Sequence, residues 1–166
     1  MRARSREGLL ETVAQIDRIL EALDVTVREA KTKAMDFVRT PPTAFDLRGI
    51  GSLLHDFYTA IEDIFEVIAG DINGSRPDAF DWHKQLLTRM TLEVPEVRPA
   101  VISKGLARTL DEYLRFRHVF RNVYGYMLEW ERLRPLLYGI PAAYEQFRRE
   151  ISAFRQFLLD LAHKLG

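Results

Sequence analysis

The chain has 166 residues, of which 47% are hydrophobic, 29% charged and 11% aromatic. This composition predicts one globular domain, residues 1–166, with a substantial core. Basic and acidic residues balance at 24 each, so overall charge gives no attraction to nucleic acid or membrane, and any such attraction must be local. There is no cysteine, which excludes disulfides, thiolate nucleophiles and cysteine metal sites.

The amino-terminal segment predicts a long amphipathic helix, which Ser5 is placed to cap. Its apolar residues recur at alternating intervals of three and four: Leu9, Val13, Ile16, Leu20, Leu23, Val27, Ala30 and Ala34. The "TPPT" at 40–43 ends this helix, because proline cannot donate a backbone hydrogen bond and restricts the residue before it. The basic start lacks the apolar core of a signal peptide, and no apolar run is long enough to span a bilayer. We therefore expect a soluble, cytoplasmic protein.

A second helix is predicted through "LRGIGSLLHDFYTAIEDIFEVIAGDI", residues 47–72, and a shorter one in "AFDWHKQLLTRM", residues 79–90. The second helix buries one face: Leu54, Phe57, Ile61, Ile64, Phe65 and Ile68. Gly49 and Gly51 near its start leave room for another backbone or mark a frayed end. The acids Glu62, Asp63 and Glu66 are expected on a solvated face. Trp82 is interpreted as a core plug that opens the short helix beside His83.

The fourth helix is predicted over "AVISKGLARTLDEYLRFRHVFRNVYGYMLEWERL", residues 100–133, with Ser103 as a cap near its start. "RPLLYGIP" at 134–141 is expected to break the chain. The last helix is expected over 142–165, with seven residues facing inward: Tyr144, Phe147, Ile151, Phe154, Phe157, Leu158 and Leu161. With no strand alternation, the fold class is all-α: an antiparallel helical bundle of four long helices plus a short helix.

The four histidines, His55, His83, His118 and His163, offer little sign of a metal centre. None forms part of a helical metal motif such as HExxH or ExxH. The sequence therefore predicts no metal and no cofactor. His55 and His83 are expected at helix surfaces or cap contacts, and His163 at a solvated chain end.

One stretch of the fourth helix, "RFRHVFRNVYGY" at 115–126, combines aromatic residues with cations. At about 100° per residue, the aromatics gather on one side. A second side carries Arg115, Arg117, His118, Arg121 and Asn122. Arginine, whose planar fork suits phosphate, stands at all three basic positions. Gly125 has no side chain and so would leave a gap on the helix surface. It makes a helix about 1 kcal/mol less stable than alanine would. A plain solvated face is the alternative to an anion or RNA-backbone site.

The same stretch, "LRFRHVFRNVYGYMLEWERL", resembles the signature helix of HepT-like proteins in the HEPN superfamily (higher eukaryotes and prokaryotes nucleotide-binding). The HepT motif is R-x4-H-x-Y, and it falls here on Arg117, Asn122 and Tyr124. The upstream "LLHDFYTAIEDIFEVIAGDINGS" and "DWHKQLLTRM" are also similar to this branch. The resemblance spans the chain from about the second helix onward.

The resemblance implies a HEPN-like, dimeric helical protein with a metal-independent endoribonuclease centre, acting as a toxin in a toxin–antitoxin system. The motif histidine would transfer protons, and Arg117 would stabilise the charged transition state. Arg115 and Arg121 are the candidate nucleic-acid or phosphate contacts. The antitoxin partner implied is a small nucleotidyltransferase, and Tyr124 is then the candidate residue for modification with AMP.

Asn122 departs from the motif, because an amide cannot take a proton at neutral pH. Either His118, one turn earlier, supplies the proton transfer, or catalysis is weakened or lost. A second hypothesis is a non-catalytic nucleotide- or RNA-binding partner subunit of a nucleotidyltransferase. A third is a purely structural bundle within a larger assembly.

Overall fold

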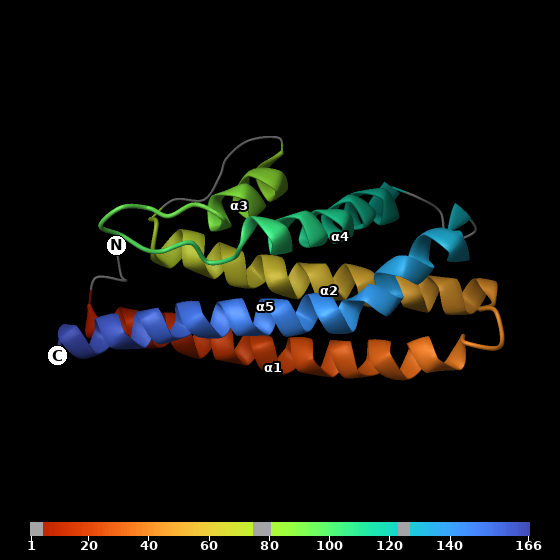
Figure 1. The fold of residues 1–166 in the computed structure, drawn as a ribbon, viewed down its shortest axis with the longest axis horizontal. Helices are drawn as coiled ribbons and strands as arrows, with labels where there is room; N and C mark the ends of the chain where they lie inside the picture. Colours follow the sequence, from red (N-terminus) through yellow and green to blue (C-terminus); the bar gives the residue numbers. More distant parts are fainter. Residues whose placement is uncertain (1–4, 75–80, 123–126) are drawn as a thin grey trace.

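The structure, a computed structural model, describes residues 5–74, 81–122 and 127–166. Five helices follow one another in these ranges: α1 (Arg6–Asp36), α2 (Ala44–Asp71), α3 (Trp82–Met90), α4 (Lys104–Asn122) and α5 (Trp130–Lys164). The four long helices run alternately in opposite directions, with the short α3 lying against α2 and α4 (Figure 1). The predicted all-α antiparallel bundle is confirmed.

The core is built from the periodic apolar faces of the long helices. All eight residues predicted for the first helix are buried, and so are all six predicted for the second. In α5 the pattern is looser, since Tyr144, Phe157 and Leu161 are only partly buried. α1 packs on both α2 and α5. Among the described residues, no helix is both long enough and apolar enough to cross a membrane.

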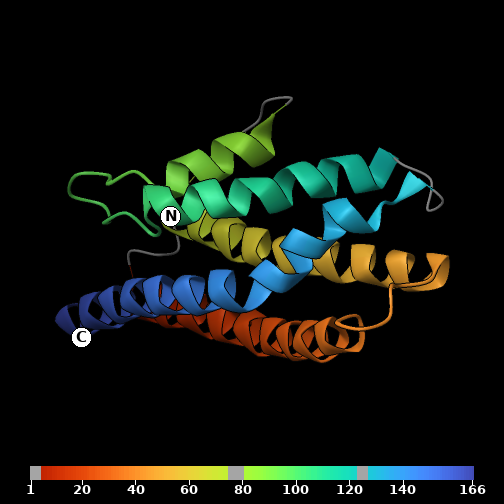
Figure 2. The ribbon, with the colours of Figure 1, turned by 45° about the vertical axis from the view of Figure 1, so that its right-hand side comes forward.

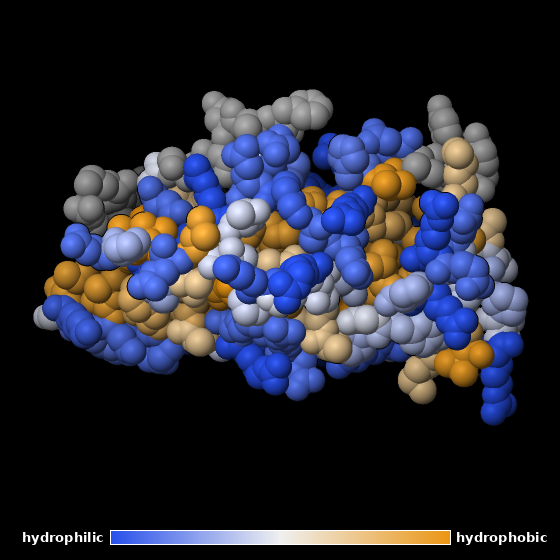
Figure 3. Space-filling model, turned by 45° about the horizontal axis from the view of Figure 1, so that its top comes forward, coloured by the Kyte–Doolittle hydropathy of each residue, from blue (hydrophilic) through white to orange (hydrophobic). Residues whose placement is uncertain are grey.

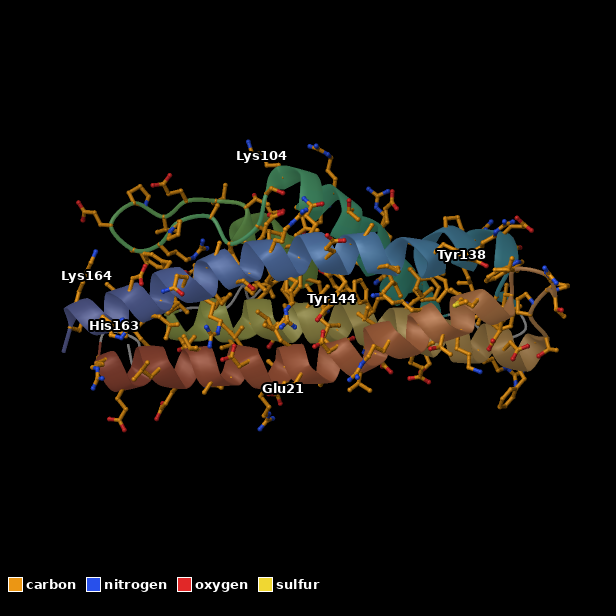
Figure 4. The ribbon with its side chains drawn as sticks, turned by 60° about the horizontal axis from the view of Figure 1, so that its bottom comes forward. Glu21, Lys104, Tyr138, Tyr144, His163 and Lys164 are labelled. Atoms are coloured by element: carbon orange, nitrogen blue, oxygen red, sulfur yellow. The ribbon has the colours of Figure 1, made fainter. Side chains whose placement is uncertain are left out.

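Hydrogen bonds between α1 and α5 supplement this packing. The Tyr138 hydroxyl donates to the Ala34 carbonyl at 2.9 Å, and the Tyr144 hydroxyl donates to the Asp24 carboxylate. Figure 4 shows Tyr144 at the seam between the two helices. Further along, Arg155 forms a two-pronged pair with Asp17 at 2.6 and 2.7 Å. This side of the bundle is therefore held by side-chain bonds as well as by apolar contact.

The end of α4 differs from the prediction, because α4 ends at Asn122 rather than continuing to residue 133. The Asn122 side chain donates to the His118 carbonyl at 2.9 Å, four residues back. Asparagine used in this way competes with the helix for its own carbonyls, and Gly125 follows as a weak helix former. The predicted gap at Gly125 lies outside the described residues.

The predicted break at 134–141 is also wrong, because α5 runs through Pro135 and Pro141. Each proline removes one backbone donor and bends the helix, and Figure 2 shows α5 changing direction along this part. Packing outweighs that cost, since Leu133, Leu137 and Ile140 in the same stretch are buried. The Tyr113 hydroxyl also donates to the Leu136 carbonyl at 2.8 Å.

Side-chain caps begin α1, α2 and α4. Ser5 accepts from the Gly8 N–H at 3.0 Å, and Ser103 accepts from the Leu106 N–H at 3.1 Å, as predicted. Thr43 and Asp46 form a reciprocal capping box at the start of α2. The hydrogen bonds from the Thr43 backbone and side chain lower the pKa of Asp46.

Thr43→Ala should therefore lower the free energy of unfolding by about 1 kcal/mol, measured by urea denaturation. The part of this effect that comes from the Asp46 carboxylate is present above the unfolded pKa and is lost as the pH falls through the lowered folded pKa. The difference between variant and wild type should therefore shrink in acid to the part due to the Thr43 hydroxyl accepting from the Asp46 N–H. Thr40→Ala is the matched control, since Thr40 is exposed and lies outside the helices. An equal effect of the two substitutions would contradict the role of the cap.

Candidate functional site

Arg117 lies at the junction of α2, α3 and α4, on the buried side of α4. Its side chain is 13% exposed. It continues the buried stripe formed by Leu106, Leu110 and Tyr113, at the same three-and-four spacing. The prediction that Arg117 lies on an outward cationic face is therefore wrong, because its guanidinium contacts a buried carboxylate.

That carboxylate belongs to Glu62 of α2, which has a side chain only 3% exposed. Glu62 Oε1 accepts from Arg117 Nη1 at 2.6 Å, and Glu62 Oε2 lies 2.8 Å from His83 Nδ1. Arg117 Nη1 is also 3.0 Å from His83 Nδ1. We call Glu62, His83 and Arg117 the triad. The expectation that Glu62 sits on a solvated face and His83 at an ordinary surface is wrong, since each contacts the motif arginine.

The first turn of α3 is fixed by a histidine–carboxylate contact and an ion pair. His83 contacts Glu62 of α2, and Lys84 Nζ donates to Asp111 Oδ1 of α4 at 2.5 Å. Asp111 also accepts from Arg115 Nη2 at 2.9 Å. The Trp82 ring stacks on the His83 ring, with centroids 3.7 Å apart. Trp82 is thus a partly buried cover for the imidazole as well as a core residue.

Two buried polar atoms beside the triad are unpaired within the described part of the chain: the Tyr58 hydroxyl and Arg117 Nε. Burial raises the pKa of Tyr58 well above its usual range, with a further contribution from the Glu62 charge. The phenol therefore stays a neutral donor. Desolvation also raises the pKa of Asp63, and the Arg117 charge partly offsets this. The centre thus combines a buried acid, an arginine, a histidine and a neutral phenol.

The remaining predicted site residues lie apart from the triad. His118, Arg121 and Asn122 are exposed on α4, and so is Arg115. Within the described residues, neither His118 nor Arg121 has an ion-pair partner, whereas Arg115 is bound to Asp111. Tyr124 lies outside the described residues. Figure 3 shows hydrophilic residues across much of the face over α3 and α4, with hydrophobic residues between them.

The missing side chain at Gly51 of α2 leaves room for the Phe120 ring of α4 and not for another backbone. A Cβ at Gly51 would come within 2.7 Å of Phe120 Cε2. Phe120 stacks on Phe116 with centroids 5.6 Å apart and contacts His55 at 5.9 Å. This aromatic seam joins α2 to the carboxyl-terminal part of α4, which carries Arg117, and so helps to fix the arginine against Glu62.

A cavity of about 630 Å³ lies elsewhere, between the start of α1 and the end of α5. Leu9, Asp71, Val97 and Leu161 are among its lining residues, and no member of the triad is. The candidate site is therefore the triad and not this cavity.

This chain is an all-α bundle with a polar centre between its helices, in which the partly buried Arg117 contacts an acid and a histidine. The family model for HepT-like protein matches residues 49–158, which is more than half of the chain and extends from α2 into α5. The chain therefore belongs to the HepT-like family of HEPN-type proteins. No curated protein and no solved structure matched it.

Proposed function

We propose that this HepT-like protein cleaves RNA without a metal, as the toxin component of a toxin–antitoxin system. The observation that carries the proposal is Arg117, a guanidinium oriented by the Glu62 carboxylate at 2.6 Å. Arg121 and His118 are exposed on the same helix. A fixed guanidinium stabilises charge developing on a phosphate at no reorganisation cost. The exposed Arg121 guanidinium supplies local attraction for the RNA backbone, which the zero net charge of the chain does not.

The proposed reaction uses the 2′-hydroxyl of RNA as nucleophile. The O2′–P bond forms and the P–O5′ bond breaks. The 2′-hydroxyl loses its proton, and the leaving 5′ oxygen gains one. Arg117 holds the phosphate oxygens that gain charge. RNA should therefore be cleaved in excess chelator, and a substrate with a 2′-deoxy nucleotide at the cleaved position should not.

Substitution of Arg117 tests this directly. Arg117→Lys keeps the charge but loses the fork, and we expect the cleavage rate to fall by about 100-fold, the range for losing one preorganised donor. Cleavage of a labelled RNA in chelator gives the rate, and circular dichroism confirms that the variant is folded. Arg108→Ala, an exposed arginine near the start of α4, is the matched control. An undiminished rate in Arg117→Lys contradicts the proposal.

A non-catalytic role is the second candidate, and it is favoured by one contact. The Asn122 amide, at the motif histidine position, donates back to the His118 carbonyl at 2.9 Å and cannot transfer protons. The chain would then bind nucleotide or RNA as the partner subunit of a nucleotidyltransferase. Calorimetry that detects saturable RNA or ATP binding, weakened in Arg121→Ala, without any cleavage by wild type, would favour this candidate.

The same proposal includes two binding partners, a second copy of this chain and a nucleotidyltransferase antitoxin. A homodimer would bring two sites into one cleft, and a nucleotidyltransferase antitoxin would modify Tyr124 with AMP. Mass spectrometry of the chain incubated with such a partner and ATP checks the modification. Loss of the added mass in Tyr124→Phe would support Tyr124 as the acceptor.

A further inference from the structure

His83 is the histidine nearest to the motif arginine, and it comes from a different helix. Its Nδ1 lies 2.8 Å from Glu62 Oε2 and 3.0 Å from Arg117 Nη1. Its side chain is 25% exposed, so the ring is anchored on one edge while part of it remains open to solvent. The stacked Trp82 ring limits its rotation.

The two contacts at Nδ1 compete, because one nitrogen cannot donate to Glu62 and accept from Arg117 at the same time. Arg117 Nη1 already donates to Glu62 Oε1 at 2.6 Å. An unprotonated Nδ1 would hold its lone pair 2.8 Å from the carboxylate oxygen Glu62 Oε2 with no proton between them, whereas a proton on Nδ1 makes a charge-assisted hydrogen bond there. The favoured tautomer therefore carries its proton on Nδ1 and donates it to Glu62. This leaves the Nε2 lone pair to accept a proton.

The other two candidates for proton transfer are less well placed. Asn122 is an amide whose Nδ2 donates to the backbone of its own helix. His118 is exposed, and within the described residues its ring has no hydrogen bond or ion pair that would orient it toward Arg117. Histidine needs such an orienting group to act efficiently as a base. Glu62 provides one only for His83.

We propose that His83 is the proton-transfer group of the Arg117 centre, replacing the histidine that the family motif places where this chain has Asn122. This inference rests on the proposed ribonuclease function. His83 Nε2 takes the 2′-hydroxyl proton as the O2′–P bond forms and the P–O5′ bond breaks. Solvent water supplies the proton to the leaving 5′ oxygen, and His83 then returns its proton to solvent. Glu62 keeps the ring in the tautomer that leaves Nε2 unprotonated.

The decisive variant is His83→Asn. Its amide occupies the place of Nδ1, so it can still donate to Glu62 and hold α3, but it cannot carry a proton. We expect its cleavage rate at pH 7 to fall by about 100-fold or more, as for the loss of a general base. The acidic limb of the wild-type pH profile should also disappear. The charged groups that contact the ring are Glu62 from α2 and Arg117 from α4. His163→Asn, at the exposed end of α5, is the matched control.

Three outcomes separate this inference from the proposed function. Wild-type cleavage that persists in His83→Asn overturns the role of His83 and leaves the ribonuclease proposal intact. Cleavage lost in His118→Asn and retained in His83→Asn assigns the role to His118 instead. No cleavage by wild type refutes the ribonuclease proposal and this role with it.

The tautomer can be measured without any substrate. Imidazole ¹⁵N NMR of the folded protein should show Nδ1 protonated in neutral His83, and Glu62→Gln should weaken that preference. A neutral His83 protonated on Nε2 would overturn the inference, because Nε2 would then have no lone pair to take the proton.

Discussion

Replacing Glu62 by alanine is expected to lower the free energy of unfolding by about 3 to 5 kcal/mol, the usual cost of removing one partner of a buried ion pair. The Glu62 side chain is 3% exposed and that of Arg117 is 13% exposed. Without the carboxylate, the guanidinium loses its 2.6 Å hydrogen bond and stays largely out of water. Urea denaturation followed by circular dichroism gives the value.

Two further variants separate the charge from the packing. Glu62→Met combined with Arg117→Met replaces the ion pair by apolar chains, and most of the lost stability should return, because neither desolvated charge remains. Glu21→Ala, an acid projecting from the outer face of α1 (Figure 4), is the control and should stay within about 0.5 kcal/mol of wild type. If Glu62→Ala matches this control, the ion pair does not stabilise the fold.

The expected loss of stability bears on the proposed function, because Glu62 also orients Arg117. Burying these charged groups costs free energy, and other contacts in the bundle must offset that cost. The α1–α5 side supplies such compensation, with a long apolar face and the Arg155–Asp17 pair at 2.6 Å. The unequal distribution of apolar and polar contacts across the bundle is consistent with a stabilising side and a functional side.

The apolar faces of α1 and α2 were predictable because burial of aliphatic residues dominates the energy of those helices. The triad was not, because arginine and glutamate are mostly exposed in proteins, so their residue type favours the solvent side. Two signals were present in the sequence. Arg117 continues the spacing of Leu110 and Tyr113, and Glu62 lies one turn after the buried Tyr58. A charged residue within an apolar stripe indicates a buried pair, although only the fold identifies its partner.

The contribution of His83 could not be found from spacing, because it comes from another helix, 34 residues before Arg117 in the chain. The path of α5 through Pro135 and Pro141 was mispredicted for a related reason. Local rules give the cost of a proline, but not the packing energy that outweighs it. In both cases the deciding interactions are tertiary.

The connection between α3 and α4 depends on a second buried arginine, Arg98, which is 3% exposed. Its guanidinium donates to the carbonyls of Arg89, Leu92 and Pro99 at 2.8–3.0 Å, and to Asn73 Oδ1 at 2.9 Å. Burial lowers its pKa, and its described partners include no carboxylate. Arg98 thus holds the segment that follows α3 by binding backbone oxygens.

Arg98→Ala is accordingly expected to lower the free energy of unfolding by at least about 3 kcal/mol, because several buried acceptors lose their donor at about 1–3 kcal/mol each. Arg98→Lys should recover only part of this, since an ammonium cannot reach four acceptors from a planar fork. Chemical denaturation measures both variants. Asn73→Ala, which removes one acceptor only, should cost about 1 kcal/mol.

The same substitution should reach the candidate site through α3. Arg98 donates a hydrogen bond to the Arg89 carbonyl near the end of α3, while the contacts of His83 and Lys84 fix the beginning of α3. Freeing the far end should raise amide hydrogen exchange along the whole helix and lower RNA cleavage, without touching the triad. If exchange rises only after residue 90, then the contacts of His83 and Lys84 suffice to hold α3, and Arg98 stabilises the following loop without affecting the candidate site.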